Sequence, residues 1–311
     1  MPELFVTIVW SVAGAALLAT LMGCASQWGW LFDLSSHFRL QYAWLLGICT
    51  VLFVALRQPL GAGATMAGML INVWSILPVY VRRPSQQNSR TFRAMSANLW
   101  TRNRSYEKVR RYLRTINADF MVLQEVHDEW LSALQELRGD YPFSKWVSLR
   151  GGFGLLLLSR LPVEQVDVVP TGTAGLPSIV ARLQLGEERL TVIGTHPHSP
   201  TTPRRTAFRN RHLAHLAEMV AAQRGPVMVL GDLNTTSWTE AFQQFLQHAK
   251  LQDSRVGFGL QPTWPVFLPF LGIPIDHCAA SSDVIIVQRR VGSNIGSDHY
   301  PIIVDFAIGA P

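Results

Sequence analysis

The chain has 311 residues, of which 48% are hydrophobic, and a formal net charge of +6. Its three cysteines include no Cys-x-x-Cys pair, which argues against a disulfide framework and against a structural zinc site. Residues 1–81 contain only Glu3, Asp33, Arg39 and Arg57, whose charges sum to zero, so the remainder of the chain carries the whole +6.

Residues 1–81 are predicted to form a membrane anchor. Their apolar stretches cover about residues 4–23, 40–56 and 60–81. Each stretch is close to the ~20 residues that cross a bilayer as a helix, so we expect about three transmembrane helices. Between the first two stretches lie aromatic residues typical of a membrane interface, Trp28, Trp30 and Phe32.

The orientation of this anchor stays open on the residues alone. The third stretch is followed by Arg82, Arg83, Arg90 and Arg93. The positive-inside rule would keep that end in the cytoplasm, but the rule is weak where a large domain follows. Residues 82–90 are polar, contain a proline and show no periodicity, so they are predicted to be a linker.

From about residue 91 the pattern changes to alternating strands and helices. Strands are predicted at 91–100, 119–126, 152–159, 226–234, 282–287 and 301–308, with a hairpin around Gly186. Helices are predicted at 105–118, with Ser105 as its cap, and at about 204–223. This mixed order favours packed sheets with flanking helices over a simple doubly wound parallel sheet.

Polar side chains follow or precede several of these apolar strands. They are Asn98, Glu125, His196, Asp232, Asn234, Asp276, Asp298 and His299. Singly, each has an ordinary explanation as a turn former, a helix cap or a partner of local backbone. Their repetition at one strand end after another favours a shared site, because sheet enzymes position their reactive groups there.

One chemistry accounts for these residue types together. Carboxylate and amide oxygens are typical ligands of Mg²⁺. A carboxylate beside an amide can orient and deprotonate an attacking water, and an Asp–His pair can hold an imidazole toward developing charge. The sequence has no G-x-S-x-G motif, so metal-assisted hydrolysis of a phosphate ester is favoured over a serine nucleophile.

The ordered motifs N-x-W, Q-E, T-H, G-D-x-N, I-D-H and S-D-H resemble those of the endonuclease/exonuclease/phosphatase superfamily, the deoxyribonuclease I-like enzymes. The resemblance covers about residues 91–308, and the catalytic domain is taken as 91–311. It implies a four-layered α/β sandwich, in which two packed β-sheets are flanked by helices.

The resemblance also implies roles for individual residues. Around the Mg²⁺ ion, for which Mn²⁺ is an alternative, it implies Glu125 as the main ligand with Asn98 and Asp298 beside it. For catalysis it implies Asp232 as the residue that activates water, Asn234 and His196 as phosphate contacts, and His299 as a phosphate-facing imidazole paired with Asp276.

Other residues have two open interpretations. His198 with Arg204, Arg205 and Arg209 forms either a second phosphate-binding patch or a solvated helix start. Trp264 lines either the substrate cleft or the core. His277 is expected to pack behind Asp276 rather than to react.

An anchor before such a domain is similar to the layout of membrane-bound bacterial members of the family, such as the VanJ-type proteins. This implies a multi-pass protein of the bacterial inner membrane with an extracytoplasmic catalytic domain. The expected partners are the lipid bilayer and a phospholipid or lipid-linked phosphate, cleaved by a phosphodiesterase or pyrophosphohydrolase reaction. A membrane-tethered nuclease acting on nucleic acid is the alternative, and a catalytically inactive membrane scaffold is a third hypothesis.

Overall fold

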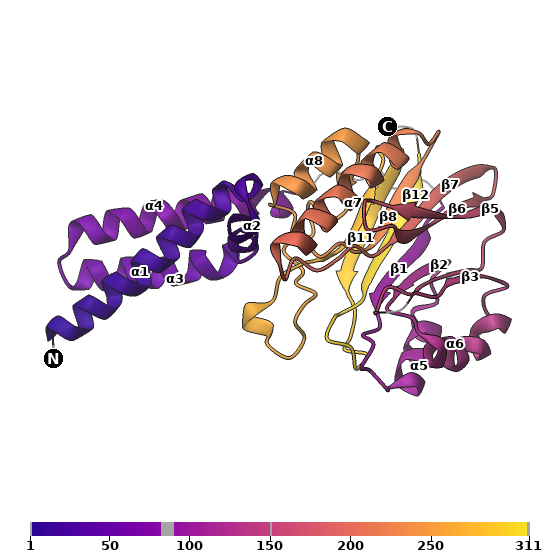
Figure 1. Ribbon diagram of the computed structural model, residues 1–311, viewed down its shortest axis with the longest axis horizontal. Coiled ribbons are helices and arrows are strands. Elements are labelled where there is room, and N and C mark those ends of the chain that lie inside the picture. Colours follow the sequence, from indigo (N-terminus) through magenta and orange to yellow (C-terminus); the bar gives the residue numbers. More distant parts are fainter. Residues whose placement is uncertain (1, 82–89, 150, 310–311) are drawn as a thin grey trace.

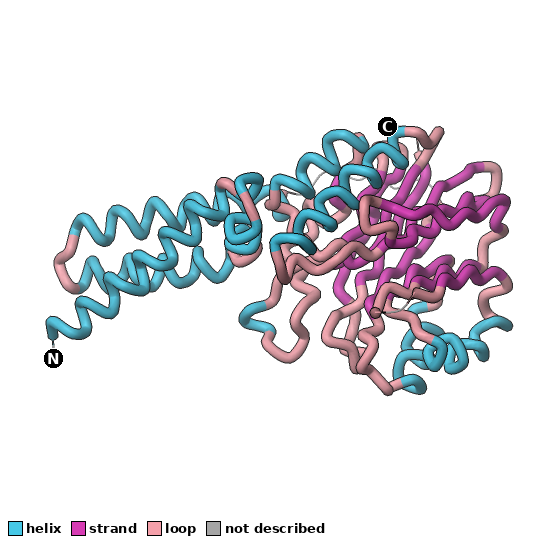
Figure 2. Tube along the Cα trace, in the orientation of Figure 1, coloured by secondary structure: helices cyan, strands magenta, loops and turns pink. Residues whose placement is uncertain are grey.

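The computed structural model describes residues 2–81, 90–149 and 151–309 (Figure 1). The predicted linker therefore lies outside the described residues except for Arg90. Two regions follow one another along the described chain: an elongated helical bundle and a sheet-containing domain (Figures 1 and 2).

The helical bundle forms where the three apolar stretches were predicted. Its helices are α1 (Pro2–Cys24), α2 (Trp30–Ser36), α3 (Arg39–Ala55) and α4 (Pro59–Ile76), with 3-10 turns η1 (Ser26–Trp28) and η2 (Leu77–Tyr80). Two segments, Glu3–Cys24 and Pro59–Tyr80, are long and apolar enough to cross a membrane. The pair α2 and α3, bent by 71°, counts as a third candidate span if it is taken as one unit.

A buried polar cluster joins the ends of α1, α3 and α4 that lie nearest the sheet domain. Arg39 donates to the carbonyl of Thr20 at 3.1 Å and to Oδ1 of Asn72 at 3.3 Å. The amide of Asn72 in turn donates to Oγ1 of Thr20 at 2.8 Å. These bonds satisfy polar groups that would otherwise be costly to bury in an apolar bundle.

The sheet domain contains two mixed six-stranded sheets. The first has the order β11-β12-β1-β2-β4-β3, and its strands are β1 (Phe92–Asn98), β2 (Phe120–Gln124), β3 (Phe143–Val147), β4 (Leu155–Ser159), β11 (Val284–Val291) and β12 (Ile302–Ile308). The second has the order β5-β6-β7-β8-β10-β9, and its strands are β5 (Val163–Thr171), β6 (Leu176–Leu185), β7 (Glu188–Thr195), β8 (Val227–Asp232), β9 (Gln252–Asp253) and β10 (Asp276–Ala280).

Three hydrophobic layers hold the sheets and helices together. Side chains such as Val122, Leu157 and Leu230 fill the space between the two sheets. Outside the first sheet, a second cluster packs beneath α5 (Tyr106–Ile116), α6 (Asp128–Leu134) and η3 (Gln135–Gly139). Outside the second sheet, a third cluster packs beneath α7 (Pro203–Ala221) and α8 (Glu240–Ala249). The predicted four-layered α/β sandwich is therefore confirmed.

The predicted strands and the hairpin at Gly186 are present, and Ser105 occupies the N-cap position of α5 without a side-chain capping bond. Several elements were not predicted, among them β3, β5, α6 and α8. Strand β5 was missed because it is mostly exposed, with no alternation of buried and exposed residues, and contains Pro170 near its end. As an edge strand it tolerates both features.

Strand direction brings the predicted polar residues to one edge of the sandwich. Strands β1 and β2 run parallel, as do β7 and β8, so the carboxyl ends within each pair lie side by side. Strand β10 runs antiparallel to β8, and its first residue, Asp276, is in register with Asp232 at the end of β8. Residues that are far apart in the sequence thus meet at this edge.

Candidate active site

A cavity of about 900 Å³ opens at this edge of the sandwich. The predicted residues Glu125, His196, Asp232, Asn234, Asp298 and His299 all line it. Asn98 and Asp276 are buried directly behind this lining, where they contact Asp232 and His299. The fold therefore brings all eight predicted site residues together.

Asn98, the last residue of β1, bridges two carboxylates. Its Nδ2 donates to Oε1 of Glu125 at 3.0 Å and to Oδ2 of Asp232 at 3.1 Å. Its Oδ1 accepts from the backbone N–H of Trp100 at 2.9 Å, which fixes the orientation of the amide. Because Glu125 follows β2 and Asp232 ends β8, this one amide joins the two sheets of the sandwich.

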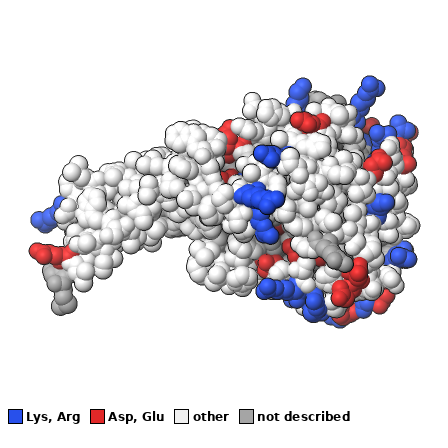
Figure 3. Space-filling model, viewed as in Figure 1, with Lys and Arg blue, Asp and Glu red and all other residues white. Residues whose placement is uncertain are grey.

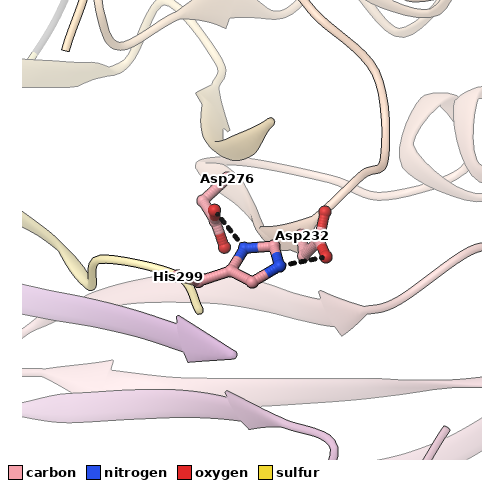
Figure 4. Close-up of side chains that lie close together, drawn as sticks. All are labelled: Asp232, Asp276 and His299. Carbon is pink, nitrogen blue, oxygen red and sulfur yellow. Dashed lines mark hydrogen bonds and ion pairs between the residues drawn. The ribbon is translucent and has the colours of Figure 1, made fainter. Parts of the chain in front are cut away.

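His299 lies between two carboxylates, as Figure 4 shows. Its Nδ1 is 2.9 Å from Oδ2 of Asp276, and its Nε2 is 3.7 Å from Oδ2 of Asp232. The backbone N–H of His299 donates to Oγ of Ser297, whose hydroxyl donates to the carbonyl of Asn98. The imidazole is thus held by its neighbours while Nε2 faces the cavity.

Burial and charge move the pKa values of this group in a consistent pattern. Burial opposes a charged imidazole, but Asp276 and Asp232 outweigh it and raise the pKa of His299 to about 10. Burial raises the pKa of Asp232 to about 6, even though His299 opposes this rise. Burial also disfavours the Asp276 carboxylate, yet the charge of His299 and its hydrogen bond hold the pKa of Asp276 below its usual range. The favoured state is an imidazolium paired with Asp276.

His196 and Asn234 also contact Asp232. Nε2 of His196 is 3.5 Å from Oδ2 of Asp232. The backbone N–H of Asn234 donates to Oδ1 of Asp232 at 2.9 Å, and its side-chain amide donates to the carbonyl of Pro197 at 3.0 Å. Asp232 is therefore fixed through both of its oxygens.

The chemistry around Glu125 and Asp298 fits a divalent cation. Both carboxylates line the cavity, and Oδ1 of Asp298 is buried without a hydrogen-bond partner. Burial raises the pKa of Asp298, and the neighbouring negative charge of Glu125 adds to this rise. Oδ1 of Asp298 also lies 4.0 Å from Nε2 of His299, whose charge opposes this rise. Carboxylate oxygens such as these are the donors that Mg²⁺ or Mn²⁺ prefers.

Asp232, Asp276 and His299 also lie close enough together to hold a metal ion by spacing alone. However, Nδ1 of His299 is already used by Asp276, and the pKa of His299 favours its protonated form. A protonated imidazole cannot ligate a metal. Glu125 and Asp298 are therefore the carboxylates that could hold a cation, whereas the geometry of this trio suits proton handling.

Left-handed backbone conformations occur where the chain leaves the strands of the site. Trp100, Glu125 and Asn234 have φ values of 59°, 59° and 50°. Such conformations are uncommon for residues other than glycine and are concentrated at functional sites, where the surrounding structure enforces them.

The structure settles the interpretations that the sequence left open. Trp264 lines the cavity, and its Nε1 donates to Oδ2 of Asp298 at 3.3 Å. His277 is buried behind the site, as expected, and its Nε2 is 2.8 Å from the carbonyl of Thr235.

The possible second phosphate-binding patch does not include Arg209. This side chain is fully buried, and its Nη2 bonds Oδ1 of Asp33 in α2 at 2.5 Å. His198 packs its ring against Phe153 and Phe208, and burial together with the charge of Arg205 lowers its pKa. Of the three arginines in the predicted patch, only Arg205 lines the cavity.

Sequence reasoning missed one wall of the cavity. Trp30, Leu34, His37 and Phe38, from α2 and the turn after it, line the cavity opposite the strand ends. Nε1 of Trp30 donates to the carbonyl of Pro200 at 2.8 Å, so this aromatic residue faces the sheet domain. The sequence signal was the pair Asp33 and His37, two polar residues one helical turn apart in an apolar region.

Comparison with known proteins gives a family match and a set of similar folds. The sequence model of the Endonuclease/Exonuclease/phosphatase family matches residues 95–299, which include every predicted site residue. No curated protein sequence matches this chain.

Several solved structures share the fold. An endonuclease/exonuclease/phosphatase from Beutenbergia cavernae is 18% identical with a TM-score of 0.59, and the match covers 71% of this chain and 72% of that one. A truncated TDP2 from Caenorhabditis elegans is 19% identical with a TM-score of 0.58, covering 70% and 98%. Sphingomyelinase C from Streptomyces griseocarneus is 17% identical with a TM-score of 0.54, covering 70% and 99%. At these identities the likeness concerns the fold alone.

Proposed function

Because the chain belongs to the endonuclease/exonuclease/phosphatase family, we propose that it is a membrane-anchored, divalent-metal-dependent phosphoesterase that hydrolyses its substrate with an activated water. The observation that carries this proposal is the convergence of Glu125, Asp232 and His299 on one cavity. Two carboxylates and an imidazole at a single site match the needs of phosphate-ester hydrolysis.

In the proposed reaction Asp232 accepts a proton from the attacking water. Its oxygens are oriented by Asn98, Asn234 and His196, which supports a fixed direction of attack. Nε2 of the His299 imidazolium faces the same space and donates a hydrogen bond to a phosphoryl oxygen, where negative charge develops. Asp276 is a positioning residue, because it acts through Nδ1 of His299.

Glu125 and Asp298 would hold the cation, which we propose to be Mg²⁺, with Mn²⁺ as an alternative. When bound, such an ion neutralises phosphate charge and polarises the phosphoryl group. Asn98 contributes by keeping the Glu125 carboxylate in place through its hydrogen bond.

We propose a phospholipid or lipid-linked phosphate as the substrate, cleaved at a phosphodiester or pyrophosphate bond. The support is the composition of the cavity wall, where Trp30, Leu34 and Phe38 of the helical bundle face Ile273 and Ile275. An apolar wall beside a phosphate site suits a substrate whose hydrocarbon begins close to the phosphorus. Tethering to the bilayer also raises the effective concentration of such a substrate.

A nuclease is the second candidate function. Arg102 and Arg205 line the cavity and could contact a nucleic-acid backbone. The net charge of +6 is modest, however, and a bilayer anchor adds no evident advantage for nucleic acid.

We further propose that α1, α3 and α4 all span a bacterial inner membrane, with the catalytic domain on the extracytoplasmic side. The support is the alternating course of these helices and the resemblance in layout to membrane-bound family members. Long domains cross a membrane largely regardless of flanking arginines.

Hydrolysis of bis(p-nitrophenyl) phosphate by the detergent-solubilised full chain tests the reaction class. We expect turnover with Mg²⁺ that is lost with EDTA, and a loss of roughly 10²–10⁴-fold in Asp232→Asn, because the variant lacks the general base. Asp167→Asn is the matched control, since Asp167 is exposed on β5 away from the cavity. Full activity in Asp232→Asn would rule out the proposed base.

A substrate panel tests the substrate class. Extracted membrane lipids, plasmid DNA and RNA are offered to the same preparation, and phosphate-containing products are separated chromatographically. We expect lipid-derived products; cleavage of nucleic acid with intact lipids would favour the nuclease.

A further inference from the structure

One loop of the catalytic domain exposes several large apolar side chains. The apolar loop, residues 265–272, contains the 3-10 turn η4 (Pro269–Leu271). Its Phe267 and Phe270 are 65% and 71% exposed, and Leu268 and Leu271 are each 37% exposed. A contiguous exposed group of this kind marks an interaction surface rather than ordinary protein surface.

The surroundings of the apolar loop carry no charge. Residues 256–275 contain no Asp, Glu, Lys, Arg or His. Figure 3 shows charged side chains gathered on the outer parts of the catalytic domain, while its lower flank beside the helical bundle is white. Moving this segment of 20 residues out of water requires no desolvation of an ionisable side chain.

The apolar loop lies at the level where the candidate membrane spans begin. Nε2 of Gln41, in the first turn of α3, donates to the carbonyls of Phe270 at 3.3 Å and of Gly272 at 3.2 Å. The exposed apolar surface continues from the loop to the bundle, which exposes Trp44 near the start of α3 and Trp28 and Leu31 before it. Figure 1 shows the loop projecting from the side of the domain that faces the bundle.

The base of the apolar loop is part of the cavity. Trp264 and Ile273 pair across it, with hydrogen bonds of 3.1 Å and 2.7 Å between their backbones. Both residues line the cavity, and Trp264 also bonds Asp298. The loop therefore connects the candidate cation site to the exposed apolar surface.

We propose that the apolar loop inserts Phe267 and Phe270 into the hydrocarbon boundary of the bilayer and forms a second membrane contact beside the helical anchor. The occupant is lipid, because the surface is uncharged and is continuous with the candidate spans at Gln41. Large aromatic side chains on an apolar surface are suited to this interfacial zone. The inference rests on the proposed membrane function, and its consequence is a continuous apolar path from bilayer to cavity.

Spin labelling of the full chain in lipid nanodiscs tests insertion directly. A nitroxide is attached at Phe270→Cys in a Cys24→Ser background, because Cys49 and Cys278 are buried. We expect the label to collide more often with oxygen, which concentrates in hydrocarbon, than with a water-soluble nickel complex. A label at Asp167→Cys, an exposed site on the edge strand β5, should show the opposite preference.

Equal nickel accessibility at both sites would overturn the proposal. Strong dipolar coupling between Phe270→Cys labels on separate chains would also overturn it, because the occupant would then be a second copy. This readout needs no enzymatic activity, so it remains informative if the chain hydrolyses nothing.

A second variant tests the consequence for substrate entry. We expect Phe267→Ser/Phe270→Ser to lower the ratio of turnover on vesicle-embedded lipid to turnover on soluble bis(p-nitrophenyl) phosphate by at least about tenfold, because the loop loses both of its exposed phenylalanine rings. Val168→Ser, at an exposed apolar position on β5, is the control. An unchanged ratio would contradict the proposed path, whereas absence of turnover on both substrates in the unmodified chain would contradict the proposed function instead.

Discussion

The pairing of His299 with Asp276 is the feature of the site that most strongly defines a protonation state. One carboxylate oxygen lies 2.9 Å from Nδ1, and the surrounding negative charges raise the pKa of the imidazole to about 10. The other nitrogen, Nε2, is thereby kept as a donor toward the cavity. Asp276 itself is fully buried, does not line the cavity and reaches it only through His299.

Asp276→Asn should therefore lower kcat while leaving KM nearly unchanged. The variant keeps a hydrogen-bond partner for Nδ1 but removes the charge that stabilises the imidazolium. We therefore expect kcat to fall by roughly 10²–10⁴-fold. Steady-state kinetics on bis(p-nitrophenyl) phosphate checks this, with the thermal unfolding midpoint measured alongside. A loss of kcat that is matched by unfolding would indicate a structural role for Asp276 only.

A second buried group governs stability rather than chemistry. Asp253 bonds Arg255 at 2.9 Å within the second sheet, and both side chains are buried. Burial opposes the carboxylate, but the charges of Arg255, His277 and Arg289 together hold the pKa of Asp253 well below its usual range.

The sign of the resulting pH dependence follows from that depressed pKa. The ionised carboxylate of Asp253 stabilises the folded chain. This stabilisation is fully present above the ordinary aspartate pKa of about 4 and is lost as the pH falls toward the lower pKa of Asp253 in the folded chain. Asp253→Asn should cost about 3 kcal/mol at pH 7, because it leaves buried Arg255 without its partner, and should flatten the loss of stability below pH 4. Denaturant unfolding of both proteins between pH 3 and pH 7, a range set by that window, measures the effect. Equal stabilities at pH 7 would contradict it.

At the level of elements, α2 joins the anchor to the catalytic domain. Its Asp33 pairs with Arg209 of α7, and His37, one residue beyond α2, has Nδ1 3.1 Å from Oγ1 of Thr236. Ser26, in η1, accepts from the backbone N–H of Glu240 at the start of α8. These bonds hold α2, whose Trp30 forms part of the cavity wall, against the catalytic domain.

Removing one charge of the Asp33–Arg209 ion pair should lower the free energy of unfolding more than removing both charges. Arg209→Met leaves the Asp33 carboxylate buried without its cation, and we expect a loss of about 3 kcal/mol. Asp33→Asn combined with Arg209→Met should recover part of that loss, because no uncompensated charge remains. Unfolding free energies of the full chain in detergent give the double-mutant cycle. Additive losses would show that the two side chains are not coupled.

The same elements explain how far the sequence could predict this molecule. Strand ends were predictable because β1, β2 and β8 are short apolar runs that finish in polar residues such as Asn98 and Asp232. Element α2 was not predicted, because its Trp30 and Phe32 were interpreted as ordinary membrane-interface residues, and only the structure shows that Arg209 of α7 pairs with Asp33. Arg209 was misassigned for the same reason: nothing local to its helix shows that a residue 176 positions earlier neutralises it.

At the scale of the whole molecule, the two ends of the helical bundle differ. The N-terminus lies at the tip remote from the catalytic domain, and the domain follows the end of α4 at the other tip (Figure 1). A bundle in which three segments alternate in direction places its two flanking regions on opposite faces of a membrane.

Tags at the two termini should therefore report opposite compartments. We expect an N-terminal tag to be protected and a C-terminal tag to be accessible to a membrane-impermeant reagent on intact cells, in line with an extracytoplasmic catalytic domain. Permeabilised cells, in which both tags must react, are the control. Accessibility of both tags on intact cells would contradict the three-span arrangement, and the reverse pattern would contradict the proposed side.

The buried ion pair between Asp33 of α2 and Arg209 of α7 also bears on the choice of substrate. Because Asp33 and Arg209 fasten the anchor to the domain, the cation-binding carboxylates stand at a constant height above the lipid surface once the spans are embedded. That height would determine how far from the lipid surface a phosphorus atom must lie to reach the site. If the chain hydrolyses a membrane lipid as proposed, we expect it to cleave amphiphiles whose phosphorus lies at the matching elevation and to leave intact those with a longer or shorter spacer between tail and phosphorus.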